Sequence, residues 1–232
     1  MASYGMIFDL DGTLAYTLED IATAVNNTLS KLGYKTRTKA EILKFINNGA
    51  RELVRRALPK TVQDVEFIVD SALDVYGEEY SKCYLEKTQV YDGITEVLAE
   101  QKKNGVKLAV LSNKQDAFVK NIVYTLFGKK LFTVVQGQAS GMIAKPDPTS
   151  TLQACKQMGV KPSNCLFIGD SDVDIQTAQN AQITSIGVAW GYREREVLEE
   201  AQADFIVETP ADLYNVLTEQ ISKMKQASKS KK

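Results

Sequence analysis

Six short apolar segments are the feature that most constrains the fold of this 232-residue chain. They are Gly5–Phe8, Lys107–Leu111, Phe132–Val135, Cys165–Ile168, Thr184–Val188 and Phe205–Val207. None of them alternates between apolar and polar residues, so each is suited to a strand that is buried on both faces. Segments with helical periodicity, such as 94–104 and 118–126, separate them. We therefore predict an α/β fold with a doubly wound, Rossmann-like parallel sheet.

This alternation is interrupted between Leu14 and about Val90, where we find no strand. The stretch contains three helical segments, Leu18–Leu32, Thr38–Ile46, and Thr61 to about Tyr84. Roughly 75 helical residues inserted after the first strand indicate a lid over the sheet. We expect a core of residues 1–14 and 88–222, a helical cap of residues 15–87 with hinges near 15–17 and 88–92, and a basic tail of residues 223–232.

The charge balance excludes some classes of partner. Lysine plus arginine number 28 and aspartate plus glutamate 29, so there is no overall basic field to hold nucleic acid. No apolar run approaches the ~18 residues needed to cross a membrane, and the absence of a leader favours the cytoplasm. The last ten residues contain five lysines and no acid. We expect a solvated, frayed terminus there, with a weak polyanion contact as the alternative.

The chain contains no histidine, which excludes Ser-His-Asp triads, His-ligated zinc and phosphohistidine chemistry. Its three cysteines, Cys83, Cys155 and Cys165, are odd in number and lack Cys-x-x-Cys spacing, which argues against a disulfide framework or a thiolate metal site. We expect them to be buried or half-buried in a reducing compartment. Any chemistry must therefore use carboxylates, lysine and hydroxyl groups.

Polar residues follow several predicted strands, at the edge where ligands bind in open α/β sheets. Asp9 and Asp11 follow the first strand and project to the same side of the chain. The alternatives are an Asp-rich turn or a calcium loop, although the glycine and the twelfth residue do not match a calcium loop. Ser112 and Asn113 end the second strand, where they also suit the start of a helix.

A second acidic cluster follows the fourth strand. Asp170, Asp172 and Asp174 lie within five residues at the start of a helix, and one of them could cap it, but capping does not require three acids. Lys145 precedes another helix, and taken alone it suits a surface lysine before a turn. These residues become informative in combination.

An aspartate pair, a hydroxyl, a lysine and a second acidic cluster in this order resemble the haloacid dehalogenase-like hydrolase superfamily. The resemblance spans Gly5 to about Tyr192. The helical insertion looks like a C1-type cap, and residues 45–51 and 188–193 are most similar to the phosphoglycolate phosphatase branch. The chain departs from the pattern at residues 15–17, where Tyr16 replaces an acid that relatives often carry.

The resemblance implies that Asp9, the backbone carbonyl of Asp11, and Asp170 bind a metal ion. Four clustered carboxylates would also repel a phosphate dianion, by roughly 4 kcal/mol per charge pair at ~4 Å and an effective dielectric of ~20, so a cation is required. An oxygen-only donor set favours Mg²⁺. The residues expected to bind or position the phosphoryl group are Thr13, Ser112, Asn113, Lys145 and, through Lys145 or a metal-bound water, Asp174.

With the charge neutralised, Asp9 can attack phosphorus, and Asp11 can protonate the leaving alcohol and then activate water. On the cap, Gly49 and Arg51 are candidate substrate contacts. Arg51 can pair with a distal carboxylate, although a solvated helix arginine is an equal alternative.

These expectations describe a cytoplasmic, Mg²⁺-dependent phosphatase acting on a small phosphorylated metabolite, with 2-phosphoglycolate as a candidate. A sugar phosphomutase would use the same constellation. A dehalogenase is disfavoured because its chemistry does not require the acid at Asp11. A receiver-type signalling domain would have its phospho-accepting aspartate in mid-chain, not after the first strand. Nothing in the sequence specifies an oligomeric state.

Overall fold

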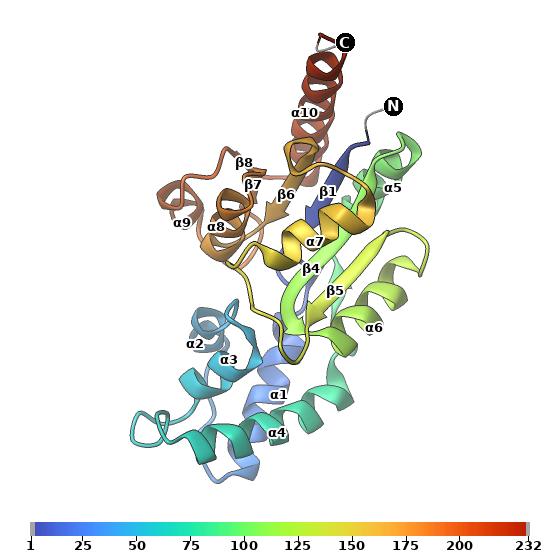
Figure 1. Cartoon of the computed structure of the whole chain (residues 1–232). Helices are drawn as coiled ribbons and strands as arrows, with labels where there is room; N and C mark the ends of the chain where they lie inside the picture. Colours follow the sequence, from blue (N-terminus) through green and yellow to red (C-terminus); the bar gives the residue numbers. More distant parts are fainter. Residues whose placement is uncertain (1–2, 231–232) are drawn as a thin grey trace.

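A six-stranded parallel sheet forms the core of the computed structural model, which describes residues 3–230 (Figure 1). Its strands are β1 (Gly5–Phe8), β4 (Lys107–Gln115), β5 (Val134–Gln138), β6 (Cys165–Gly169), β7 (Thr184–Val188) and β8 (Phe205–Val207). Their order is β5-β4-β1-β6-β7-β8, and every neighbouring pair is parallel. The predicted doubly wound α/β fold is confirmed.

The sheet order explains where a site can form. The chain builds β1, β4 and β5 toward one edge and then crosses to the other side of β1 to build β6, β7 and β8. The carboxyl ends of β4, β1 and β6 therefore lie side by side at the point where the strand order reverses, which is where open α/β sheets bind ligands.

Helices cover both faces of the sheet, which accounts for the apolar character of the strands. One face carries α5 (Ile94–Lys103), α6 (Asp116–Phe127) and α10 (Pro210–Ser230), and the other carries α7 (Thr149–Met158) and α8 (Asp172–Asn180). In β1, Met6 and Phe8 pack into the first layer and Ile7 into the second, following the two-residue period of a strand. A 3₁₀ turn, Pro162–Asn164, precedes β6, and α9 (Arg195–Glu200) lies between β7 and β8.

Four of the five helices between β1 and β4 form a separate hydrophobic cluster below the sheet in Figure 1. They are α1 (Leu18–Lys31), α2 (Lys39–Phe45), α3 (Gly49–Ala57) and α4 (Glu66–Cys83). Helix α3 lies outside the three predicted helical segments, and α4 begins later than the predicted Thr61. Pro59 accounts for the end of α3 at Ala57, because the residue before a proline is driven out of the helical region and Leu58 is extended at ψ 156°. We propose residues 15–87 as the cap.

Two short strands connect the core with these helices. Strands β2 (Ala15–Tyr16) and β3 (Gln89–Val90) pair antiparallel where the sequence indicated hinges, but they are too short to be recognised by pattern. The buried Asp20 side chain accepts hydrogen bonds of 2.7–3.1 Å from the backbone of Lys87 and from the backbone and hydroxyl of Thr88. The start of α1 is thereby tied to the second linker.

The basic end of the chain is not frayed as far as the structure describes it, contrary to the prediction. Helix α10 continues to Ser230, and the Tyr4 hydroxyl donates to Ser228 Oγ at 3.3 Å. The buried Leu213, Leu217 and Ile221 anchor the helix, and the residues that follow are mostly good helix formers. Residues 231–232 of the predicted tail lie outside the described residues.

Within residues 3–230, no helix combines the length and apolarity needed to cross a membrane. All three cysteines are buried, as predicted, and each is a free thiol, with Cys155 Sγ 3.4 Å from Cys165 Sγ.

Candidate active site

The topological switch point brings together predicted site residues that are far apart in the sequence. Asp9 directly follows β1, Ser112 and Asn113 lie in β4, and Asp170 directly follows β6. Asp174 lies in the first turn of α8. Each strand delivers its side chain to the same edge because all three strands are parallel and adjacent.

Carboxylate oxygens of Asp9, Asp170 and Asp174 lie within 4.8 Å of one another, and all three residues are buried. Asp170 is held rigidly, because it accepts hydrogen bonds from Thr13 Oγ1 at 3.1 Å and from the backbone of Tyr192 at 2.7 Å. Asp9 Oδ1 is buried, and although Lys145 Nζ lies 2.9 Å away, this oxygen accepts no well-aligned hydrogen bond. An unsatisfied buried carboxylate oxygen within a cluster of hard oxygen donors fits a divalent cation such as Mg²⁺.

Lys145 is the buried counter-charge to this cluster and not the surface lysine that its local sequence also suited. Its Nζ lies 2.6 Å from Asp174 Oδ1, 2.9 Å from Asp9 Oδ1 and 3.3 Å from the carbonyl of Leu111. Burial by itself would lower the pKa of Lys145, but Asp174 and Asp9 outweigh burial and raise it above its ordinary value. The lysine therefore stays charged.

One ammonium does not balance three buried acids. Burial raises the pKa of Asp9 to about 7, and the neighbouring Asp174 and Asp11 add to this effect while Lys145 opposes it. Burial, together with Asp174 and Asp9, also raises the pKa of Asp170 well above its usual range. A bound cation would remove this strain, because it favours the ionised form of every carboxylate that faces it.

Asp174 has two roles, of which capping is one. Its Oδ2 accepts hydrogen bonds from the backbone (3.2 Å) and hydroxyl (2.6 Å) of Ser171, which completes a capping box at the start of α8. Its Oδ1 holds Lys145. The same side chain thus begins the helix and orients the lysine.

Asn113 positions the Lys145 loop with its side chain. Its Oδ1 accepts from the backbone of Lys145 at 2.9 Å, and its Nδ2 donates to the carbonyl of Lys145 at 3.1 Å. Nδ2 also lies 3.4 Å from the carbonyl of Asn47 in the cap. Ser112 Oγ accepts from the backbone of Lys114 at 3.3 Å. The predicted hydrogen bonds of Ser112 and Asn113 to a phosphate stay predictions.

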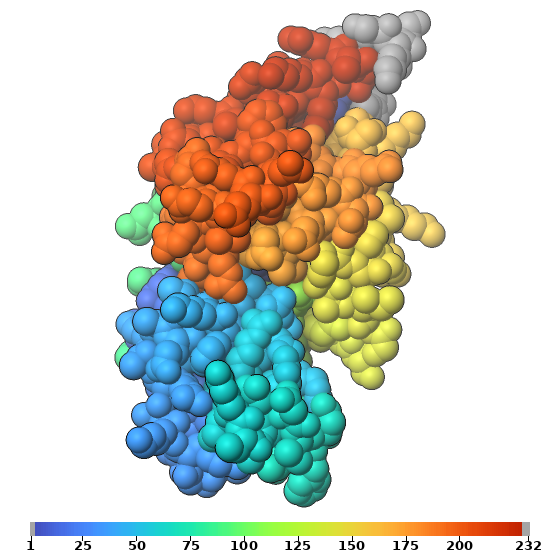
Figure 2. Space-filling view, turned by 90° about the vertical axis from the view of Figure 1, so that its left-hand side faces the viewer, coloured from blue at the N-terminus to red at the C-terminus, as the bar shows by residue number. Residues whose placement is uncertain are grey.

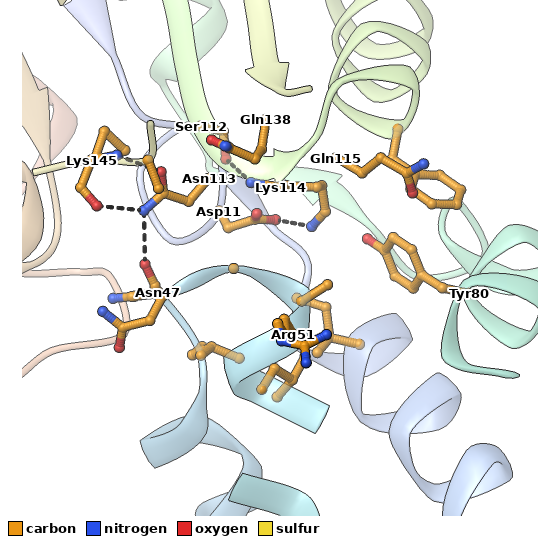
Figure 3. A pocket seen from close by; sticks show the side chains of 18 of the residues that line it. Asp11, Asn47, Arg51, Tyr80, Ser112, Asn113, Lys114, Gln115, Gln138 and Lys145 are labelled. Atoms are coloured by element: carbon orange, nitrogen blue, oxygen red, sulfur yellow. Dashed lines mark hydrogen bonds and ion pairs between the residues drawn. The ribbon is translucent and has the colours of Figure 1, made fainter. Parts of the chain in front are cut away.

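Asp11 lies outside the acidic cluster and belongs to the wall of a cavity (Figure 3). Its Oδ1 accepts hydrogen bonds of 2.5 Å from Thr17 Oγ1 and from Lys114 Nζ. Thr17 is in turn held by the Tyr192 hydroxyl, which accepts from the Thr17 backbone at 2.6 Å. No role was predicted for Lys114, and Thr17 and Tyr192 were noted only within the hinge at 15–17 and the family-like segment 188–193. Only the position of Lys114, directly after Ser112 and Asn113, could have drawn attention to it.

The cavity has a volume of about 610 Å³ and lies between the sheet edge and the cap, which Figure 2 shows in blue to teal beneath the core. Asp9, Asp11 and Lys145 line it from the core. Residues from the cap line the opposite side, among them Asn47 and Arg51. The volume suits a small molecule, which would be enclosed by both parts of the chain.

The sequence profile of the haloacid dehalogenase-like hydrolase family matches residues 6–188. The chain belongs to this family. A phosphoglycolate phosphatase of Pseudomonas fluorescens (strain Pf0-1) is 33% identical over 208 residues, which is 88% of this chain and 75% of the relative. The phosphoglycolate phosphatase of Psychrobacter arcticus is 35% identical over 192 residues, which is 81% of this chain and 84% of the relative. A crystal structure of a predicted phosphoglycolate phosphatase from Haemophilus somnus has a TM-score of 0.85 and 27% identity. The match covers 93% of this chain and 98% of that chain. The resemblance seen in the sequence is confirmed.

The two cap residues predicted to contact substrate in this hydrolase line the cavity but differ in setting. Gly49 begins α3 at φ +83°, and a Cβ added there would lie 3.4 Å from the carbonyl oxygen of Asn113. Arg51 is 46% exposed, and its guanidinium is already paired with Glu66 and Asp70. A distal carboxylate would have to compete with these two acids, which favours the alternative of a solvated helix arginine.

Gly12 offers a test of how tightly the acidic cluster is packed. A Cβ added at Gly12, which has φ +82°, would lie 2.3 Å from Asp170 Oδ2. We expect Gly12→Ala to displace Asp170, to lower kcat about 100-fold and to destabilise the hydrolase by about 1–3 kcal/mol. Steady-state kinetics and urea unfolding check this prediction.

Gly105→Ala is the matched control, because Gly105 has a similar φ of +78° and no atom near the added Cβ. Equal effects of the two substitutions on kcat would contradict the assignment.

Proposed function

We propose that this hydrolase is a Mg²⁺-dependent phosphatase that cleaves a small phosphomonoester through an aspartyl-phosphate on Asp9. The observation that carries the proposal is the meeting of Asp9, Asp170, Asp174 and Lys145, of which Asp9 and Lys145 line the cap-covered cavity. The relatives named phosphoglycolate phosphatase make 2-phosphoglycolate the first substrate to test.

Asp9, the backbone carbonyl of Asp11, and Asp170 would hold the metal ion, with Asp174 in the same cluster. When bound, Mg²⁺ supplies positive charge that lets the phosphate dianion enter a site lined by acids. Lys145 adds a fixed ammonium beside Asp9, where it can neutralise a phosphoryl oxygen. Asp174 keeps that ammonium in place.

The reaction then proceeds through two half-reactions. A carboxylate oxygen of Asp9 attacks phosphorus, the bond from phosphorus to the leaving oxygen breaks, and Asp11 donates a proton to that oxygen. Asp11, now ionised, takes a proton from water, whose oxygen attacks the same phosphorus and releases inorganic phosphate from Asp9. The hydrogen bonds from Thr17 and Lys114 position Asp11 for both steps.

The cap limits the size of the substrate. We propose that it closes about the linkers at β2 and β3 and excludes water from the reaction. The buried, unpaired cysteines fit a reducing compartment, and we propose the cytoplasm.

Metal removal tests the proposed function directly. With p-nitrophenyl phosphate or 2-phosphoglycolate as substrate, we expect phosphate release to fall at least about 100-fold in excess chelator, because the uncompensated acids repel the substrate. Added Mg²⁺ should restore activity, and Ca²⁺ should restore little of it because its coordination is larger and looser. Colorimetric phosphate assays measure this. Full turnover in chelator, or no turnover of any small phosphomonoester with Mg²⁺, would contradict the proposal.

A further inference from the structure

Lys114 places a second ammonium in the cavity, beside Asp11 and apart from the phosphoryl end. It lies in the last part of β4, its side chain is 9% exposed, and Nζ is 2.5 Å from Asp11 Oδ1. Nζ also lies 5.0 Å from the centre of the Tyr80 ring, which belongs to the cap. Figure 3 shows Lys114 between Asp11 and Tyr80 at the wall of the cavity. A cation in this enclosed position interacts strongly with any anion that enters.

The other cations that line the cavity are committed elsewhere. Among the described lining residues they are Lys145 and Arg51. Lys145 contacts Asp9 and Asp174 at the phosphoryl end. Arg51 is half exposed and pairs with Glu66 and Asp70 of α4. Within residues 3–230, Lys114 has a single carboxylate partner, and that partner is the residue that the proposed reaction uses to protonate the leaving oxygen.

The position of Asp11 determines which part of the substrate meets Lys114. Proton transfer requires the leaving oxygen to come within hydrogen-bond distance of Asp11, so the first atoms beyond that oxygen must lie near Lys114. In a phosphorylated 2-hydroxy acid, the carboxylate is separated from the leaving oxygen by one carbon atom. Such a short link keeps the carboxylate within reach of an ammonium that itself contacts Asp11.

Two aromatic rings shield Lys114 from water on one side. Tyr80 packs edge-on against Phe118 with ring centres 4.9 Å apart, and both rings line the cavity. These rings exclude water from one side of the ammonium, so a substrate carboxylate would not have to compete with free solvent there. A neutral leaving group of the same length would offer Lys114 no compensating charge.

Resting on the proposed phosphatase function, we propose that Lys114 is the residue that selects phosphorylated 2-hydroxy acids, by pairing its ammonium with the carboxylate of the leaving group. This assigns substrate selectivity to the core of the hydrolase and not to Arg51 of the cap.

The test compares kcat/KM for 2-phosphoglycolate with that for 2-hydroxyethyl phosphate, which replaces the carboxylate by a neutral CH₂OH group. Lys114→Met should lower the ratio of the two values about 10- to 100-fold, the size expected when a charge-assisted hydrogen bond is lost. Lys114→Arg keeps the charge and should retain the ratio within about threefold.

Inhibition by glycolate provides a second readout. Glycolate should inhibit Lys114→Met at least about 10-fold more weakly than it inhibits the unmodified protein. Lys114→Gln serves as the second charge-removing variant if Lys114→Met does not fold.

Two matched variants separate the outcomes. Lys120→Met removes an ammonium that is 44% exposed and paired with Asp116 on α6, and it should leave the ratio unchanged. Arg51→Met removes the competing cap cation. A fall in the ratio with Arg51→Met and not with Lys114→Met, or equal losses on both substrates with Lys114→Met, would overturn the inference while the phosphatase function stands. If the unmodified protein hydrolysed p-nitrophenyl phosphate with Mg²⁺ but not 2-phosphoglycolate, the inference would be wrong and the phosphatase function would stand, whereas turnover of no small phosphomonoester would contradict both.

Discussion

Asp9→Asn is expected to lower kcat by at least about 10⁴-fold, the largest effect of any single substitution in this hydrolase. The amide lacks the anionic oxygen that attacks phosphorus, and it also removes a charged ligand from the acidic cluster. The change is nearly isosteric, so the fold should survive. Removal of one of three mutually repelling buried acids should even relieve part of the strain that raises the pKa of Asp170.

Intact mass spectrometry after rapid mixing with substrate provides the second readout. The unmodified protein should gain about 80 Da, the mass of one phosphoryl group, and Asp9→Asn should not. Asp172→Asn is the matched control, because Asp172 lies on the same helix as Asp174 but outside the cluster. Phosphorylation of another residue in Asp9→Asn would show that the nucleophile has been assigned wrongly.

Lys145→Met should have the second largest effect, with kcat/KM lowered about 10³-fold. Asp9 and Asp174 would lose their only ammonium partner within the described part of the chain, and the phosphate would meet uncompensated acids. Breaking a buried ion pair from one side typically destabilises a protein by about 3–5 kcal/mol. Urea unfolding in chelator should show this loss, and added Mg²⁺ should reduce it by supplying charge to the same acids.

Lys145→Arg provides the control for charge. It keeps the cation, but its planar guanidinium does not fit a site built around a compact ammonium with contacts of 2.6 and 2.9 Å. We expect both activity and stability to lie between those of Lys145→Met and those of the unmodified protein. If Lys145→Met retained high activity, the role of Lys145 beside the phosphoryl group would be wrong.

Several features follow from local sequence alone. Continuous apolar segments predicted the strands because residues buried on both faces cannot alternate, and β7 and β8 were predicted with the bounds that the structure shows. The helical insertion was recognised by its lack of strand pattern. Chain composition without histidine limited the chemistry to oxygen ligands and lysine. The order of Asp9, Ser112, Lys145 and Asp170 indicated the family, which the match over residues 6–188 confirms.

Tertiary structure alone decided how these residues are used. Thr13 and Asp170 are 157 positions apart and meet because β1 and β6 are neighbours in the sheet, which no local pattern records. The same holds for Asp11 and Lys114, separated by 103 positions. By local sequence Lys145 suits a surface lysine, but in the structure it is buried between the sheet edge and α8. By local sequence Arg51 could bind a carboxylate of the substrate, but in the structure it pairs with Glu66 and Asp70 of α4. Local sequence determines which faces must be buried, whereas ion pairs depend on which buried faces come together, and that is decided by strand order and by the packing of the cap.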